Sequence, residues 1–312
     1  MKAFIFDPLW DELVTDDLLK QLKQAGVETI VTKEIAPLSE NKALFEGDEE
    51  RILCLNPDYV SWKLSADDYK DIPNLKGIFG AATAVHWIDM SYANTGDIPI
   101  CDIKNFSTES VAEWAIMMMF NVARQIPLLI KNDFPLDFDK DYMKYRGVEL
   151  KGKKVGVIGL GYIGSAIANR CAGLGMEVLY WNRSPKDVPY KSLELSKILK
   201  EADVIFPALS LNDDTKKLLT DNVLATIKPT AMLIAIEHHT FSADFVLSMV
   251  KEGRLYGFGF EAEPEKFGSF DGNVWAAPAY AWATDQTMYN AMVKWVENMT
   301  KAAEGKFPNR VN

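Results

Sequence analysis

The stretch KKVGVIGLGYIGSAIANRCAGLG, residues 153–175, decides the fold of this 312-residue chain. It opens on an apolar run that is typical of a buried strand, and it ends in a run with apolar residues at helical spacing. Between the two runs, Gly159, Gly161 and Gly164 form the pattern G-x-G-x-x-G. In a strand–turn–helix setting this pattern predicts a dinucleotide-binding site.

Each of the three glycines has its own physical reason. Gly159 permits the tight turn that leaves the strand, and Gly161 lets the backbone approach a pyrophosphate. Gly164 lets the helix pack closely against the strand, and the amides at the start of that helix attract the negative charge of the pyrophosphate. We expect Tyr162 and Ile163, which open the helix, to contact the same cofactor.

The next predicted strand ends in Trp181-Asn182-Arg183-Ser184. Folds of this kind that prefer NAD usually place an acid here, where it binds the ribose 2′-hydroxyl. This stretch has no acid. Asn182 and Ser184 can donate hydrogen bonds, and Arg183 supplies a planar cation suited to phosphate. The stretch therefore predicts NADP(H) as the cofactor. NAD(H) is the alternative if Arg183 is only a solvated loop residue.

Both halves of the chain alternate apolar, strand-like runs with helical stretches. The expected strands are residues 2–7, 28–32, 52–56, 75–80, 98–103, 153–159, 176–182, 203–209, 231–236, 255–261 and 274–278. Such alternation predicts parallel sheets with helices on both faces. We expect a long helix over 107–127, apolar nearly all round, in which the methionines at 117–119 fill the core. An amphipathic helix is expected from Asp285 onward.

Composition excludes several classes of protein. A formal net charge of -10 argues against nucleic acid as a partner. Cys54, Cys101 and Cys171 lie far apart without metal-ligand spacing, so we expect no metal site and a reducing cytoplasm. The start MKAFIFDPLW is not expected to act as a signal peptide, and no apolar run is long enough for a membrane span.

The order of these motifs resembles the D-isomer-specific 2-hydroxyacid dehydrogenase family over nearly the whole chain. Beyond the glycine motif, the resemblance rests on residues 75–90, 107–115, 202–219, 227–236, 250–264 and 273–287. It implies an α/β fold of two doubly wound parallel-sheet domains. A Rossmann dinucleotide-binding domain, residues 102–284, would be inserted into a flavodoxin-like substrate domain formed by residues 1–101 and 285–312.

The resemblance also implies where the ligands lie. The family's active site is in the cleft between its domains, and its members are commonly homodimers, for which the helix over 107–127 would be the contact element. Leu209 and Thr215 fall in the segment that flanks the adenine pocket. Glu261 falls where the family has an acid near the nicotinamide amide.

The family's catalytic set is largely replaced in this chain. That set is an Arg that binds the substrate carboxylate, a His that transfers the proton and a Glu that orients the His. The Arg position falls on His238 or on Glu237, depending on the direction of counting, and neither is an Arg. The proton-transfer His follows a Pro, and here the pair reads Pro278-Ala279. The Glu is matched by Glu263.

Histidines are the candidate substitutes. His238 can bind a carboxylate or donate a proton, and a neighbouring Glu237 or Glu263 would favour its charged form. The competing hypothesis is that His238 and His239 cap a strand and face solvent or a helix end. If the strand continues through both residues, His239 points to the opposite side from His238, and at most one of them enters the site.

The loop expected to hold the substrate also departs from the family. It carries Ala82-Thr83-Ala84 where the family usually has two glycines, and His86 stands at the following acid position. His86 is the second candidate for catalysis, against the competing hypothesis of a partly buried loop histidine. Tyr280 can also donate a proton, but its apolar neighbours favour packing.

Two functional hypotheses follow. The first is an NADP(H)-dependent oxidoreductase acting on a small carbonyl or hydroxy compound, with His238 or His86 managing charge and the proton. The second is a catalytically inactive or repurposed NADP(H)-binding protein, a sensor or scaffold on the same fold. All three histidines fall in segments that the resemblance places near the cleft, which favours the enzyme.

Overall fold

The computed structural model describes residues 1–134, 143–262 and 270–312, and the chain divides into two compact units. Unit 1 comprises Met1–Ser107 and Thr284–Asn312, and unit 2 comprises Thr108–Ala283. Residues 102–107, which we expected in the inserted domain, belong to unit 1. The reason is packing: Ile103 is fully buried in the core of unit 1, and the Asp102 carbonyl accepts a hydrogen bond from Asn298.

Unit 1 is built on a five-stranded sheet in which every strand pair is parallel. The order is β2-β1-β3-β4-β5, which is the flavodoxin-like doubly wound order. The strands are β1 (Lys2–Phe6), β2 (Glu28–Thr32), β3 (Arg51–Leu55), β4 (Leu75–Gly80) and β5 (Ile100–Cys101). They lie close to the runs predicted from the sequence, although β5 is much shorter than the predicted 98–103.

Alternating side chains give this sheet two apolar faces. Ala3 and Ile5 of β1 enter one core cluster, whereas Phe4 and Phe6 enter the other. The first face packs against α1 (Trp10–Leu13), α2 (Asp16–Gln24) and α12 (Asp285–Ala303), and the second against α3 (Lys42–Phe45) and α4 (Ser91–Thr95). Trp295 of α12 is buried, and its indole N–H donates to the Phe79 carbonyl, so the C-terminal helix completes unit 1.

Unit 2 is built on a seven-stranded parallel sheet. Its order is β12-β11-β10-β9-β6-β7-β8, so the direction of strand addition reverses between β6 and β9, as in a Rossmann fold. The strands are β6 (Lys154–Ile158), β7 (Glu177–Trp181), β8 (Lys191–Ser192), β9 (Val204–Pro207), β10 (Met232–Ala235), β11 (Gly257–Glu261) and β12 (Val274–Ala277). The two sheets give the fold class that the sequence predicted.

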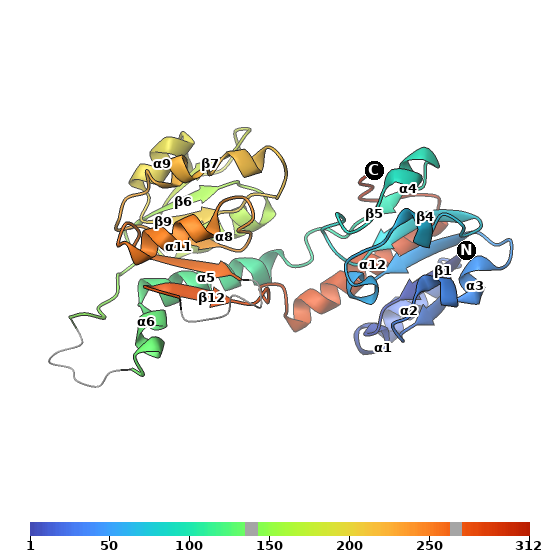
Figure 1. Ribbon diagram of the computed structural model, residues 1–312. Coiled ribbons are helices and arrows are strands. Elements are labelled where there is room, and N and C mark those ends of the chain that lie inside the picture. The colour runs from blue at the N-terminus through green and yellow to red at the C-terminus, as the bar shows by residue number, and fades with distance from the viewer. Residues whose placement is uncertain (135–142, 263–269) are drawn as a thin grey trace. The chain divides into compact units, whose positions relative to one another are not determined.

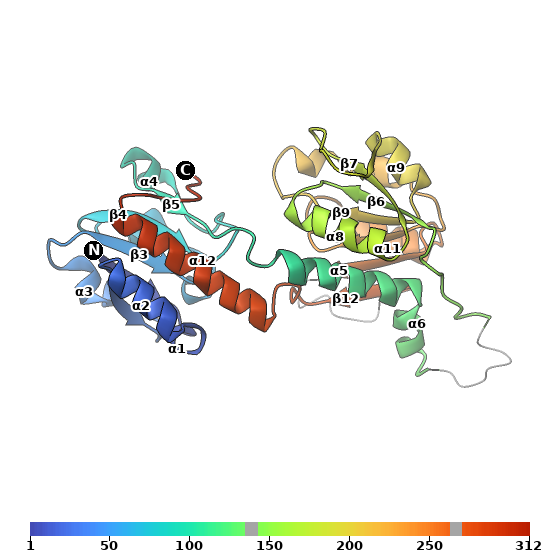
Figure 2. The same cartoon turned by 180° about the vertical axis from the view of Figure 1, so that it is seen from behind.

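Helices cover both faces of the second sheet, and Figures 1 and 2 show α8 and α11 on opposite sides of it. One face carries α5 (Thr108–Ala123) and α8 (Tyr162–Gly173), and the other carries α9 (Leu195–Glu201), α10 (Asp221–Leu224) and α11 (Ala243–Lys251). Met118 and Met119 of α5 are fully buried in the first of these cores, which confirms them as core residues.

The helix expected over 107–127 is shorter than predicted. It ends at Ala123, and Gln125 takes a left-handed backbone with φ of 54° before α6 (Ile126–Lys131) begins. A left-handed residue cannot continue a right-handed helix, so the chain turns there. No helix of the described residues is long and apolar enough to cross a membrane.

Candidate functional site

The glycine turn after β6 has the geometry that its sequence demands. Gly159 has φ of 95°, and a Cβ on it would lie 2.6 Å from the Ala208 carbonyl oxygen. A Cβ on Gly164 would lie 2.0 Å from the Gly159 carbonyl oxygen, whereas one on Gly161 would meet no described protein atom within 4 Å. The turn is thus closed toward the sheet and open at Gly161. Helix α8 begins there with no side-chain cap from its N-cap residue, which leaves its first amides for an anion.

The end of β7 lies against this turn through Asn182. The Asn182 side-chain oxygen accepts from the Leu160 amide at 3.0 Å, and its amide nitrogen donates to the Ser184 carbonyl at 2.8 Å. The Asn182 side chain thus bridges the turn after β6 and the turn after β7, and its amide nitrogen keeps a second N–H that could serve a ligand. Arg183 and Ser184 are exposed, and within the described residues Arg183 has no ion-pair partner.

The remaining predicted cofactor residues surround the same edge of the sheet. Tyr162 is 68% exposed at the first turn of α8, and Ile163 packs partly into the core. Leu209 follows β9 and is half-buried. The Thr215 hydroxyl donates to the Ser210 carbonyl at 2.7 Å, so this side chain shapes the turn after β9.

The two histidines after β10 lie together rather than on opposite sides. Strand β10 ends at Ala235, before either histidine, so strand alternation does not apply to them. The rings of His238 and His239 stack with centroids 4.2 Å apart, and the His238 ring meets Phe260 edge-on at 5.6 Å. Glu237 engages His239, whose Nδ1 and backbone N–H lie 2.9 Å and 2.6 Å from one carboxylate oxygen.

Glu261 at the end of β11 is a buried acid. Its carboxylate accepts a hydrogen bond of 2.8 Å from the Ala281 amide. Burial raises the pKa of Glu261 to about 7, because the charged carboxylate loses water, and nearby Glu237 adds a like charge. Tyr280, which we expected to pack against its apolar neighbours, is instead 58% exposed.

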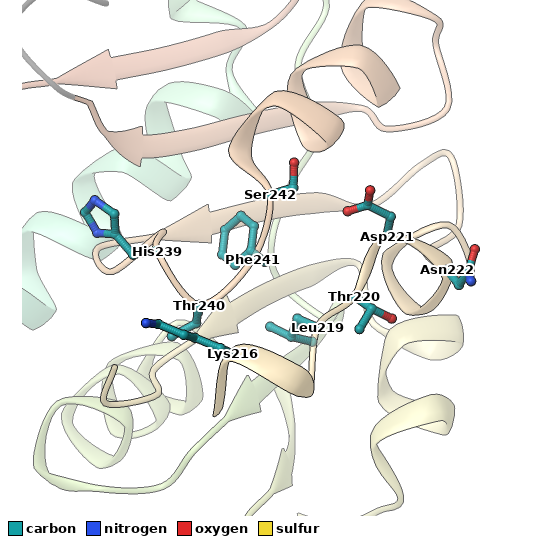
Figure 3. Close-up of a pocket in the computed structure, with 9 residues that line it drawn as sticks. All are labelled: Lys216, Leu219, Thr220, Asp221, Asn222, His239, Thr240, Phe241 and Ser242. Atoms are coloured by element: carbon teal, nitrogen blue, oxygen red, sulfur yellow. The ribbon is translucent and has the colours of Figure 1, made fainter. Parts of the chain in front are cut away.

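A hollow of about 620 Å³ lies beside the histidine pair. Figure 3 shows Lys216 and His239 at one end of it and Asn222 at the other. The Thr240 hydroxyl at this hollow is buried and has no hydrogen-bond partner among the described residues. Sequence reasoning missed Lys216 and Thr240, because no motif marks them. Only their position in turns that follow neighbouring strands could have suggested them.

The predicted substrate loop lies at the carboxyl end of β4 in unit 1. Thr83 and Ala84 are exposed, and their backbone N–H groups donate to no group within the described residues. The loop is held by a hydrogen bond of 3.0 Å from the Thr83 hydroxyl to the Ile103 carbonyl. His86 is exposed, contrary to the hypothesis of a partly buried histidine. The loop can thus present two amides and an imidazole to a ligand.

The predictions for Glu263 and for a metal site complete the comparison with the sequence. Glu263, the expected orienting acid, lies outside the described residues. Among the residues that the structure describes, no group of three or more His, Cys, Asp or Glu side chains could hold a metal ion.

Comparison with known proteins identifies relatives of this chain. Residues 116–278 match the family described as "D-isomer specific 2-hydroxyacid dehydrogenase, NAD binding domain". A glycerate dehydrogenase from Methylorubrum extorquens is 30% identical over 261 residues, which cover 80% of this chain and 82% of that protein. A glyoxylate reductase from Pyrococcus furiosus is 28% identical over 270 residues, which cover 80% of this chain and 79% of that protein.

Solved structures share the fold over the full length. The TT0316 protein from Thermus thermophilus superposes with a TM-score of 0.80 at 25% identity, and all of both chains is covered. An acyclic imino acid reductase, solved with NADPH and D-arginine, also gives a TM-score of 0.80, at 22% identity and with both chains fully covered. At that identity the second likeness shows the fold alone.

Substitutions in the glycine turn separate folding from cofactor binding. We expect Gly161→Ala to keep the melting temperature but to weaken NADPH binding roughly tenfold or more, because its methyl group takes space needed by a pyrophosphate. Gly164→Ala should lose binding and also about 1–3 kcal/mol of stability, because its methyl group overlaps the Gly159 carbonyl. Thermal unfolding and NADPH fluorescence titration measure both quantities.

The matched control for these variants is Gly173→Ala near the end of α8, where a Cβ also meets no described atom within 4 Å. It should change neither quantity. Unaltered NADPH affinity in Gly161→Ala would contradict the assignment of this turn.

Glu261 should make stability depend on pH. Its folded pKa is above its unfolded value of 4.5, so the folded protein holds the proton more tightly and stability falls as pH rises from about 4.5 to about 7. The side chain of Glu261→Gln stays neutral at every pH, so this variant should not lose that stability as pH rises. The free energy of unfolding of the variant minus that of the parent should therefore be on the order of 2–3 kcal/mol larger at about pH 8 than at about pH 5. Urea unfolding at both pH values tests this.

The control is Glu177→Gln, since Glu177 is an exposed acid at the start of β7. The same pH dependence in the Glu261→Gln variant and in the parent protein would show that Glu261 does not carry the effect.

Proposed function

The chain belongs to the D-isomer-specific 2-hydroxyacid dehydrogenase family, and on that basis we propose that it is an NADP(H)-dependent oxidoreductase acting on a small carbonyl or hydroxy compound. The observation that carries the proposal is the open glycine turn at the start of α8, with Arg183 exposed on the neighbouring strand end. Relatives named glycerate dehydrogenase and glyoxylate reductase support a small hydroxy or keto acid as substrate.

Unit 2 would hold the cofactor and unit 1 the substrate. The amides at the start of α8 suit a pyrophosphate, and Arg183 with Ser184 suits a ribose 2′-phosphate. Bound NADPH supplies the hydride. Glu261 has a pKa raised to about 7 by burial, and its protonated form can donate a hydrogen bond from one carboxyl oxygen, which suits a carboxamide oxygen.

The substrate would be bound by groups that replace the family's usual set. The exposed amides of Thr83 and Ala84 suit a carboxylate. His238 is our first candidate for the positive charge and the proton, and His86 is the second. Glu237, one of the two acids that we considered as neighbours of His238, contacts Nδ1 of His239 at 2.9 Å. Imidazole carries a charge only when protonated, unlike the Arg that it replaces.

A second function is favoured by one observation. Pro278 is followed by Ala279, and a methyl group cannot transfer a proton. This supports a nucleotide-binding sensor or scaffold without dehydrogenase activity. Under either function we propose a cytoplasmic homodimer, because the chain carries scattered free cysteines and its family members are commonly dimers.

Cofactor preference tests the phosphate site. We expect NADPH to bind more tightly than NADH, and Arg183→Gln to weaken NADPH binding roughly tenfold while leaving NADH binding nearly unchanged, because only NADPH carries the 2′-phosphate. Isothermal titration gives both dissociation constants. The control is Arg254→Gln, because Arg254 is occupied by Glu252 at 2.7 Å. Tighter binding of NADH by the parent protein would contradict the proposal.

Turnover tests the enzyme itself. NADPH oxidation should be measured over 2-keto acids, aldehydes and keto-esters, with the His238→Ala and His86→Ala variants run in parallel. We expect the loss of a general acid to slow turnover about 100-fold or more in one variant, most strongly in His238→Ala. Tight NADPH binding without turnover of any of these substrates would instead support the sensor or scaffold.

A further inference from the structure

An exposed tryptophan stands at the ligand-binding edge of unit 1. Trp62 follows η2 (Pro57–Val60), the short helix after β3, and it is 47% exposed. Ser61 and Trp62 both have left-handed backbones, with φ of 50° and 55°. Two consecutive non-glycine residues in this region cost on the order of 1–2 kcal/mol each, and such strain gathers at functional positions. The chain therefore bears a conformational cost to present a large apolar ring to solvent.

The ring is held in place rather than free. The Trp62 indole N–H donates to the Asp58 carboxylate at 2.7 Å, and the Trp62 amide donates to the Pro57 carbonyl at 2.9 Å. His86 stacks on the indole with centroids 6.3 Å apart and planes 25° apart. Trp87 meets it edge-on at 6.5 Å. Trp62 and His86 thus form a fixed aromatic surface, called here the Trp62–His86 platform.

The platform and the exposed amides of the substrate loop belong to one braced structure. The Leu64 amide donates to the Trp87 carbonyl at 2.8 Å, and the Asp89 amide donates to the Leu64 carbonyl at 2.8 Å, so the two loops pair. The Trp87 indole then donates to the Ala84 carbonyl at 2.7 Å. The Trp87 side chain therefore contacts both the backbone of the amide-bearing loop and the Trp62 ring of the platform.

Sheet topology places both loops at the same edge. Strands β3 and β4 are parallel neighbours, so the turns that follow Leu55 and Gly80 leave the sheet on one side. Ligands of open parallel sheets bind at that carboxyl edge. An acid whose carboxylate is held by the Thr83 and Ala84 amides would have an aromatic surface available to its side chain.

We propose that the Trp62–His86 platform binds the side chain of the substrate, and that the preferred substrates are 2-keto or 2-hydroxy acids with an aromatic side chain. This inference rests on the proposed function. An aryl ring laid on the platform removes apolar area of both rings from water and adds a stacking contact. Glyoxylate has no side chain and gains nothing from the platform.

The test compares phenylpyruvate with glyoxylate as substrates for NADPH oxidation. We expect the parent protein to have a kcat/KM for phenylpyruvate at least about tenfold higher than for glyoxylate. Trp62→Ala should lower kcat/KM for phenylpyruvate roughly tenfold, mainly by raising KM. The change for glyoxylate should stay within about threefold. Trp62→Phe should keep most of the kcat/KM for phenylpyruvate that Trp62→Ala loses, because phenylalanine keeps a stacking face. Tyr92→Ala, in which an exposed aromatic of the same unit is removed, should alter neither substrate.

A preference for glyoxylate, or equal losses for both substrates in Trp62→Ala, would overturn the platform and leave the proposed function standing. If no carbonyl compound is reduced, the proposed function fails, and binding of 3-phenyllactate then tests the platform by itself. Saturation-transfer NMR should show its dissociation constant rising roughly tenfold in Trp62→Ala but not in Tyr92→Ala. An unchanged constant with a loss of dimers in size-exclusion chromatography would overturn the platform and assign this face to a second copy of the chain.

Discussion

The contact between Gly164 and the Gly159 carbonyl is the constraint on which the cofactor site depends. A side chain on Gly164 would begin 2.0 Å from that oxygen, so only glycine lets α8 start directly over the end of β6. This approach sets the first amides of the helix at the point where the strand order reverses. The turns after β7 and β9 flank the same point, because both strands pair with β6. One close approach therefore brings three loops to one ligand.

In unit 1, too, the parallel strands bring the candidate groups to one edge of the sheet. All of its strand pairs are parallel, so every strand delivers its following turn to one edge. The exposed Trp62, His86 and the amides of Thr83 and Ala84 all lie in the turns after β3 and β4. In both units the candidate groups thus gather where strands end. Regular packing sets the scaffold, and the loops carry the chemistry.

Sequence patterns predicted the strands and helices well, but they predicted poorly where a strand or helix ends and how the side chains beyond that end are oriented. The tight turn expected at Gly159 and the close helix packing expected at Gly164 are both present in the structure. His239 was expected opposite His238 only if the strand continued through both residues; β10 ends before them, and their rings stack. The helix from residue 107 was expected to run past Gln125, whose left-handed backbone no apolar pattern reveals. Errors of this kind arise where a strand or helix stops, because periodicity carries no information beyond that residue.

The sequence by itself determined the two alternating α/β halves and the dinucleotide turn. Those features are local, since spacing and residue type suffice to define them. Only the tertiary structure decided that Glu237 serves His239, that Asn182 braces two turns, and that burial raises the pKa of Glu261. It also brought Trp62 and His86 together from separate loops. Such partnerships join residues from different turns or depend on where a strand ends, and the folded sheet alone sets those distances.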